Sequence, residues 1–209
     1  MTAELKIKIC GLREIQNIHE VATLKPDFMG FIFYPGSKRY AGDHFNPDVK
    51  IPEEINRVGV FVNEDISNLL VRVNHLGINY VQLHGDESAA YCKELHDMNI
   101  HVIKAFGIDE NFDFAQLDDF ESTCDLFLFD NKTRQYGGSG KKFNREILKK
   151  YKKSHPFILS GGVSIEDTDE INRIRKEFPV YGVDLNSRFE KEPGIKDINL
   201  LKGFINKIK

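Results

Sequence analysis

The 209-residue sequence has no tryptophan, only three cysteines and no large excess of charge of either sign. Cys10, Cys92 and Cys124 are odd in number and widely spaced, which argues against a disulfide framework and a zinc knuckle. The formal net charge of −3 gives no sign of a nucleic-acid partner or an acidic-membrane partner. The absence of tryptophan excludes no class of function.

Long apolar runs are also absent. No stretch is long enough to span a bilayer, and the first residues lack the basic and apolar pattern of a signal sequence. We therefore expect a cytoplasmic enzyme with no membrane partner.

The segment Asp125–Asp130 is a short apolar run that ends on a carboxylate. Such a run between turn residues predicts a buried parallel strand. A charged last residue belongs in a core only if it is paired, so Asp130 should lie at the carboxyl end of the strand. Parallel α/β folds place their active sites at that end.

The same strand-then-helix pattern recurs along the whole chain. Eight units of roughly 26 residues are near the compact limit of a (β/α)8 TIM barrel, so we predict an α/β protein with one domain over residues 1–209. An open doubly wound sheet is the alternative. The predicted strands are Lys6–Cys10, Phe28–Phe33, Val58–Val62, Tyr80–His84, His101–Phe106, Asp125–Asp130, Pro156–Ser160 and Val180–Asp184, and the predicted helices span residues 13–24, 65–76, 87–97, 112–120, 144–153, 164–176 and 198–208.

Several reactive side chains fall at or after the predicted strand ends. Cys10, His84, Asp130 and Asp184 end strands, and Arg39 follows the second strand. Each also has a structural interpretation: a small buried thiol, a hydrogen-bonded histidine, carboxylates that cap turns, and a solvated loop cation. Their common position on one rim of the barrel favours a catalytic site, and an arginine fork suits a carboxylate.

A phosphate site is predicted after strands seven and eight. Gly161 and Gly162 precede a helix, where backbone N–H groups without a nearby Cβ can surround an anion. Asn186 and Ser187 follow the last strand, and loops after strands seven and eight form the usual phosphate site of barrels. The alternative is that the glycines make tight turns. Gly137–Gly140 either forms part of a lid or reaches the same anion.

A set of ordered motifs covers nearly the whole chain. The motifs are Lys8–Leu12, Gly30–Phe33, Ser37–Arg39, Gly59–Val62, Val81–Glu87, Asp130 with Gly137–Gly140, Ser160–Gly162, Gly182–Asp184 and Glu190–Asp197. Together these motifs resemble the phosphoribosylanthranilate isomerases of tryptophan biosynthesis. The resemblance implies a cofactor-free Amadori rearrangement of N-(5-phosphoribosyl)anthranilate to 1-(2-carboxyphenylamino)-1-deoxyribulose 5-phosphate.

The resemblance also implies roles for single residues. Cys10 matches the family's general base and Asp130 its general acid. Arg39 matches an arginine that meets the anthranilate moiety, and Asp184 an aspartate near the sugar hydroxyls. His84 matches a rim histidine to which we assign no fixed role.

The segments of Gly161, Gly162 and Ser187 match the family's phosphate site. The chain departs from the family at Lys38, where proline is usual, and at Arg188, where glycine is usual. The second departure alters a residue of the phosphate loop itself.

Two other functions remain open at this stage. The sister isomerase of histidine biosynthesis performs the same chemistry, but it has aspartate in place of Cys10 and a second phosphate site, whereas Phe61–Asp65 is acidic and lacks a glycine loop. A non-catalytic phosphosugar-binding barrel would need the glycines without Cys10 and Asp130. We expect a small phosphosugar–anthranilate substrate, no cofactor, no metal and a monomer, with a homodimer as the alternative.

Overall fold

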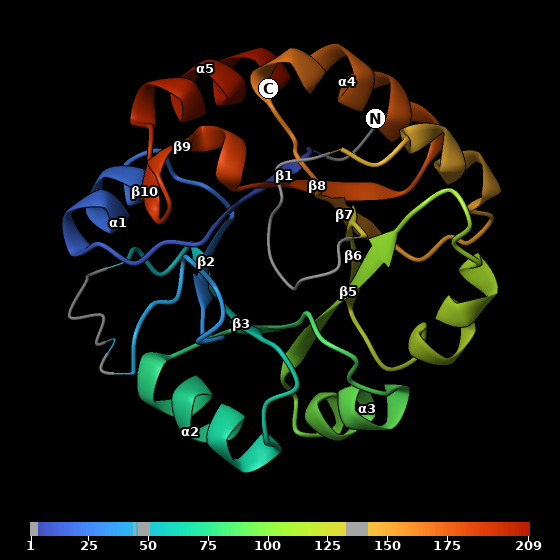
Figure 1. Cartoon of the computed structure of the whole chain (residues 1–209), viewed down its shortest axis with the longest axis horizontal. Helices are drawn as coiled ribbons and strands as arrows, with labels where there is room; N and C mark the ends of the chain where they lie inside the picture. Colours follow the sequence, from blue (N-terminus) through green and yellow to red (C-terminus); the bar gives the residue numbers. More distant parts are fainter. Residues whose placement is uncertain (1–3, 44, 46–50, 133–141) are drawn as a thin grey trace.

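Eight parallel strands form a closed barrel in the computed structural model, which describes residues 4–43, 45, 51–132 and 142–209. Each strand pairs with its successor, and β1 pairs with β8 to close the ring, around which the helices lie (Figure 1). The predicted TIM barrel is confirmed, and the open doubly wound sheet is wrong. The strands are β1 (Lys6–Cys10), β2 (Phe28–Ile32), β3 (Asn56–Phe61), β4 (Tyr80–Leu83), β5 (His101–Ile108), β6 (Leu126–Asn131), β7 (Phe157–Leu159) and β8 (Val180–Leu185).

Apolar side chains fill the inside of the barrel. Successive side chains of a strand point to opposite faces, so Leu126 and Leu128 pack inside the barrel while Phe127 and Phe129 pack on the helix side. The apolar residues inside the barrel form one cluster, and polar side chains line the pocket near the strand ends. The cluster consists of Phe28, Val58, Ile103, Ala105, Leu126, Leu128 and Ile158, with Tyr80 and Tyr181 packed against it.

Three of the described α-helices, α2, α3 and α5, begin at a polar residue whose side chain accepts a hydrogen bond from the first turn. Asp65 accepts hydrogen bonds from two backbone N–H groups at the start of α2, and Asp197 does the same for α5. Gly77 ends α2 with φ +58°, a left-handed conformation that glycine adopts without strain. The helices are α1 (Ile15–Ala22), α2 (Ile66–Leu76), α3 (Ala89–Asp97), α4 (Thr168–Glu177) and α5 (Ile198–Ile208).

Two of the predicted helices are 3₁₀-helices. The segment predicted over residues 112–120 forms η1 (Phe114–Phe120), and the segment over 144–153 forms η2 (Arg145–Lys150). In η1 the apolar residues recur every three positions, at Phe114, Leu117 and Phe120, which matches three residues per turn.

The helix predicted from Ser164 begins with a 3₁₀ turn, η3 (Ile165–Asp167), before α4. Ser164 and Asp167 form a capping box at its start.

A short hairpin follows β8 and was not predicted. After η4 (Ser187–Phe189), β9 (Glu190–Glu192) pairs antiparallel with β10 (Ile195–Lys196). Gly194 has φ +91° in its turn. The hairpin places charged residues beside the carboxyl end of β1.

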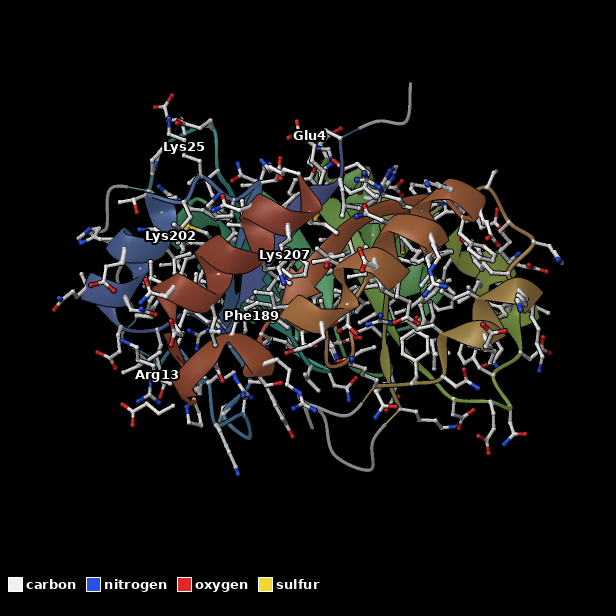
Figure 2. The ribbon with its side chains drawn as sticks, turned by 90° about the horizontal axis from the view of Figure 1, so that it is seen from above. Glu4, Arg13, Lys25, Phe189, Lys202 and Lys207 are labelled. Carbon is white, nitrogen blue, oxygen red and sulfur yellow. The ribbon has the colours of Figure 1, made fainter. Side chains whose placement is uncertain are left out.

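The two ends of the barrel differ in which loops they carry. Figure 2 shows Glu4 and Lys25, which precede β1 and β2, at one end, and Arg13, which follows β1, at the other. The carboxyl ends of the parallel strands therefore share the rim near Arg13. Within the described residues, no helix is both long and apolar enough to cross a membrane.

Candidate active site

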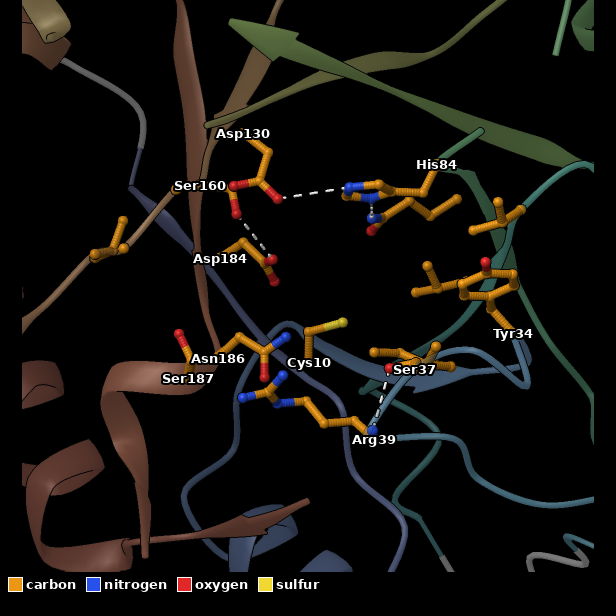
Figure 3. A pocket seen from close by; sticks show the side chains of 17 residues that line it. Cys10, Tyr34, Ser37, Arg39, His84, Asp130, Ser160, Asp184, Asn186 and Ser187 are labelled. Carbon is orange, nitrogen blue, oxygen red and sulfur yellow. Dashed lines mark hydrogen bonds and ion pairs between the residues drawn. The ribbon is translucent and has the colours of Figure 1, made fainter. Parts of the chain in front are cut away.

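A pocket of about 720 Å³ of empty volume, partly open to solvent, lies at the carboxyl ends of the strands (Figure 3). All nine residues that the sequence predicted for the site line it, so the prediction of a shared rim is confirmed. The lining residues are Cys10, Ile32, Tyr34, Ser37, Arg39, Val60, Val62, Gln82, His84, Asp130, Ser160, Gly161, Gly162, Val163, Asp184, Asn186 and Ser187.

Cys10 ends β1 and faces the pocket across from Gly30 of β2. The two residues are register partners, and a Cβ at position 30 would lie 2.7 Å from the Cys10 Sγ atom. Glycine at position 30 therefore makes room for the thiol. The Cys10 side chain is 3% exposed, and this burial raises the pKa of its thiol, while the ammonium of Lys8 opposes the rise.

Lys8 is a second polar residue on the inner face of β1. It is 1% exposed, and its Nζ atom donates to Asp184 Oδ1 at 2.9 Å. Asp184 Oδ2 accepts a hydrogen bond of 3.2 Å from the Ser160 hydroxyl. Asp184 thus lines the pocket as one member of a buried, hydrogen-bonded ion pair, and its predicted contact with sugar hydroxyls stays a prediction.

Asp130 lies near the end of β6 and faces His84, which follows β4. His84 Nε2 is 3.5 Å from Asp130 Oδ2, and His84 Nδ1 is 2.8 Å from Gln82 Nε2. The Gln82 amide nitrogen can only donate, so Nδ1 accepts in this arrangement, and Nε2 is the ring nitrogen that faces Asp130. Figure 3 shows this pair on a different side of the pocket from Cys10.

Arg39 is buried, at 8% exposure, so its interpretation as a solvated loop cation is wrong. Its Nε and Nη2 atoms donate to the carboxylate of Glu190 at 2.8 and 2.7 Å. Lys196 also donates to Glu190, at 2.7 Å, and to Asn186 Oδ1, at 2.8 Å. This network fixes the Arg39 side chain at the pocket wall.

The charges of this network stabilise one another. Burial alone would raise the pKa of Glu190, but the Arg39 hydrogen bond and the Lys196 charge outweigh it and hold the pKa below its usual value. Burial lowers the pKa of the Lys196 ammonium, and Glu190 opposes that change. Two cations therefore share one carboxylate beside the pocket.

The predicted phosphate site is placed on two neighbouring loops. Gly161 and Gly162 have φ +75° and +71°, so both occupy the left-handed region that favours glycine. A Cβ on Gly161 would lie 2.9 Å from the Asn131 backbone nitrogen. Asn186 and Ser187 come from the end of β8 and the start of η4. We call these four residues, Gly161, Gly162, Asn186 and Ser187, the phosphate cradle, and phosphate binding there stays a prediction.

Some expectations concern other parts of the chain. Gly137–Gly140 lies outside the described residues. Cys92 and Cys124 are buried, and neither lines the pocket, as expected from their sequence positions. Among the described residues, no group of three His, Cys, Asp or Glu side chains could hold a metal ion.

Sequence reasoning missed the partners of the predicted residues. Lys8, Glu190 and Lys196 lay within the motifs quoted above but received no role. Lys8 lies two positions before Cys10 in an apolar strand, so the sequence indicates that the two side chains point to the same face of that strand. The sequence does not indicate the pairing of Arg39 with Glu190, because the two residues lie 151 positions apart.

Comparison with known proteins gives a consistent result. The family model "N-(5'phosphoribosyl)anthranilate (PRA) isomerase" matches residues 7–207. The N-(5'-phosphoribosyl)anthranilate isomerase of Phocaeicola vulgatus is 41% identical, over 97% of each chain. That of Parabacteroides distasonis is 44% identical, over 97% of this chain and 92% of the relative.

Solved structures agree with the sequence relatives. The phosphoribosyl anthranilate isomerase of Thermotoga maritima is 32% identical and superposes with a TM-score of 0.84, with 98% of each chain covered. The enzyme of Thermus thermophilus gives a TM-score of 0.86 at 26% identity, again over 98% of each chain. The barrel, the pocket and these relatives lead to one conclusion: the chain belongs to the N-(5'-phosphoribosyl)anthranilate isomerase family.

Proposed function

We propose that this chain converts N-(5-phosphoribosyl)anthranilate to 1-(2-carboxyphenylamino)-1-deoxyribulose 5-phosphate, with Cys10 as the general base and Asp130 as the general acid. The reaction is an Amadori rearrangement of L-tryptophan biosynthesis, and the chain is an isomerase that uses general acid–base catalysis. A related structure at 29% identity is named as a complex with reduced 1-(o-carboxyphenylamino)-1-deoxyribulose 5-phosphate, which supports a phosphosugar substrate here.

The placement of Cys10 and Asp130 in one pocket is the observation that carries the proposal. They lie at the ends of β1 and β6, on different sides of the pocket (Figure 3). A sugar ring between them would present its ring oxygen to one residue and its C2 hydrogen to the other. General acid–base catalysis needs this two-sided access.

The chemistry follows in three steps. Asp130 donates a proton to the furanose oxygen, the C1–O bond breaks, and the nitrogen lone pair forms an iminium ion. The Cys10 thiolate then removes the C2 proton, and the C–H electron pair moves into the new C1–C2 double bond as the nitrogen becomes neutral. Finally the O2 hydroxyl loses a proton while C1 gains one, which gives the ketone.

The remaining pocket residues bind and orient the substrate. The phosphate cradle binds the 5-phosphate through backbone N–H groups. Arg39, fixed by Glu190, binds the anthranilate carboxylate, and Asp184 meets the sugar hydroxyls. His84 faces Asp130 at 3.5 Å and orients its carboxyl group toward the ring oxygen.

Turnover of two substrates tests this function against its rivals. The purified chain is incubated with N-(5-phosphoribosyl)anthranilate, whose consumption is measured by its fluorescence. In a separate assay it is incubated with the corresponding substrate of the histidine isomerase. We expect turnover of the first substrate and competition by inorganic phosphate at the cradle. Turnover of the second substrate alone would assign the chain to the sister activity. Binding of both without turnover would identify a phosphosugar-binding barrel.

The oligomeric state and location follow as smaller proposals. A Thermotoga maritima relative is named as dimeric. The large exposed hydrophobic residues of the described chain, Ile15, Val71, Met98 and Leu200, lie on different elements, so we propose a monomer. Light scattering at micromolar concentration checks this. A phosphorylated substrate is retained where it is made, so we propose a cytoplasmic location.

A further inference from the structure

Lys8 is a buried cation that the reaction above does not use. Its side chain is 1% exposed and reaches Asp184 across the β1–β8 pair, with Nζ 2.9 Å from Oδ1. The Ser160 hydroxyl donates to the other oxygen of Asp184 at 3.2 Å. A buried ion pair costs desolvation energy and is weak evidence for stability alone. Stability alone therefore does not explain why this ion pair lies inside the barrel.

Lys8 lies next to the proposed base, Cys10, on the same face of β1. Lys8 and Cys10 are two residues apart on β1, so their side chains share the inward face. Cys10, Asp184 and Ser160 all line the pocket. The Lys8 ammonium lowers the pKa of the Cys10 thiol, against the effect of burial. The ion pair thus places one fixed positive charge at the reactive thiol.

We propose that Lys8, held in place by Asp184 and Ser160, is a positioning residue that supplies the counter-charge for the Cys10 thiolate. This inference rests on the proposed function, in which Cys10 is the base. Lys8 does not touch the substrate, and it acts through the sulfur. The structure assigns it a role that a neutral side chain of the same length could not perform.

The other groups that face Cys10 support this role. Burial raises the pKa of the Cys10 thiol most, Lys8 is the largest opposing influence, Asp184 raises the pKa, and Lys196 of β10 lowers it. Lys196 lies 2.7 Å from Glu190, which also binds Arg39, so its charge is shared. Asp130 and His84 stand on the other side of the pocket. Lys8 is therefore the main cation at the thiol.

Lys8 itself stays charged in this setting. Burial alone would lower the pKa of its ammonium, but the charges of Asp184 and Cys10 outweigh burial and raise it. The carboxylate therefore has two effects: it keeps Lys8 protonated, and it anchors the ammonium below the sulfur. Because the pair is closed to solvent, salt screens it little.

The proton balance shows when the charge matters. Cys10 first releases its thiol proton to solvent, and the thiolate forms beside Lys8. The thiolate then takes the C2 proton of the iminium intermediate and becomes a neutral thiol, while the substrate nitrogen loses its positive charge. The cation therefore stabilises the state before proton removal and raises the thiolate fraction at neutral pH.

The test is a titration of Cys10 in Lys8→Met, which removes the charge and keeps the length. Thiolate absorbance is recorded against pH and corrected with the matching Cys10→Ser protein. We expect the Cys10 midpoint to rise by about one unit or more, and kcat/KM at neutral pH to fall about tenfold per unit. The loss should disappear at high pH, whereas a structural defect would persist at every pH. An unchanged midpoint would overturn the proposal.

Matched variants keep the result interpretable. Lys6→Met removes a charge from the same strand, at the far end of the barrel where Lys6 pairs with Asp27, and should leave the midpoint unchanged. If Lys8→Met does not fold, Lys8→Met with Asp184→Asn removes the pair together, and a smaller rise is expected. A fall there would contradict the proposal. The titration needs no substrate, so a shifted midpoint without turnover would disprove the isomerase function and leave the coupling standing.

Discussion

Two buried lysines, Lys8 on β1 and Lys104 on β5, have similar surroundings and different uses. Lys8 is 1% exposed and pairs with Asp184, and Lys104 is 3% exposed and pairs with Glu87. Lys8 points into the barrel beneath Cys10. Lys104 points outward, because its neighbours Ile103 and Ala105 pack inside.

The outward lysine holds backbone together. Lys104 Nζ donates to the carbonyls of Leu83 and Gly85 at 3.3 and 2.7 Å, on either side of His84. Its partner Glu87 accepts hydrogen bonds from the backbone nitrogens of Asn63 and Gly85. The outward pair therefore fixes the loops after β3 and β4, and the inward pair lies beside the Cys10 sulfur, the proposed base. The alternation of side chains along a strand thus places two similar ion pairs in different settings.

Lys104→Met should give the largest loss of stability. It leaves Glu87 as an uncompensated buried charge, and breaking a buried pair costs about 3–5 kcal/mol of unfolding free energy. Urea unfolding measures this loss. Lys93→Met, which breaks the exposed pair with Asp97, is the control and should cost about 0.5 kcal/mol or less. A loss below about 1 kcal/mol for Lys104→Met would contradict the structural role of the outward pair.

The sequence predicted most of this architecture, because strand ends and alternation are local signals. The eight strands and the inward direction of Cys10 and Asp130 follow from them. The sequence predicted a helix at Phe114–Phe120 but not its 3₁₀ type, since short apolar spacing fits two helix types. The partners of Arg39 and Lys8 depend on contacts between residues 151 and 176 positions apart, which a single sequence does not show.

Arg39→Ala should have the next largest effect, on catalysis. It removes a charge-assisted hydrogen bond to the anthranilate carboxylate, so the transition-state stabilisation that kcat/KM reports should fall by about 1.5–3 kcal/mol. A substrate analogue with aniline in place of anthranilate is the matched control, because Arg39 then has no carboxylate to bind. Equal losses with both substrates would show that Arg39 serves only to pair with Glu190.

Gly162→Val tests the phosphate cradle. A β-branched residue at φ +71° is strained by about 1–2 kcal/mol, and its side chain also crowds the anion, so KM should rise more than kcat falls. Inorganic phosphate should compete less well against the variant. Unaltered phosphate competition would place the anion elsewhere on the rim.

The smallest expected effect is the loss, at acid pH, of the contribution that the Arg39–Glu190 pair makes to the free energy of unfolding. The pKa of Glu190 is held below its usual value in the fold, so its stabilising contribution is present above the pKa of the unfolded chain and is lost as pH falls through the folded value. Urea unfolding from pH 7 toward pH 3 compares the chain with Glu190→Gln. The difference, on the order of 1 kcal/mol, should shrink toward acid pH. A difference that stays constant would exclude this linkage.

The most direct test of the account is kcat of Cys10→Ala and Asp130→Asn with N-(5-phosphoribosyl)anthranilate. Both variants should fold, as circular dichroism and urea unfolding can verify, since both side chains lie at the mouth and not in the apolar core. Each should lose about 10²–10⁴-fold in kcat with little change in substrate affinity. The double variant should lose less than the product of the single losses. A folded single variant that keeps near-normal kcat would contradict the assignment of acid and base on which the account depends.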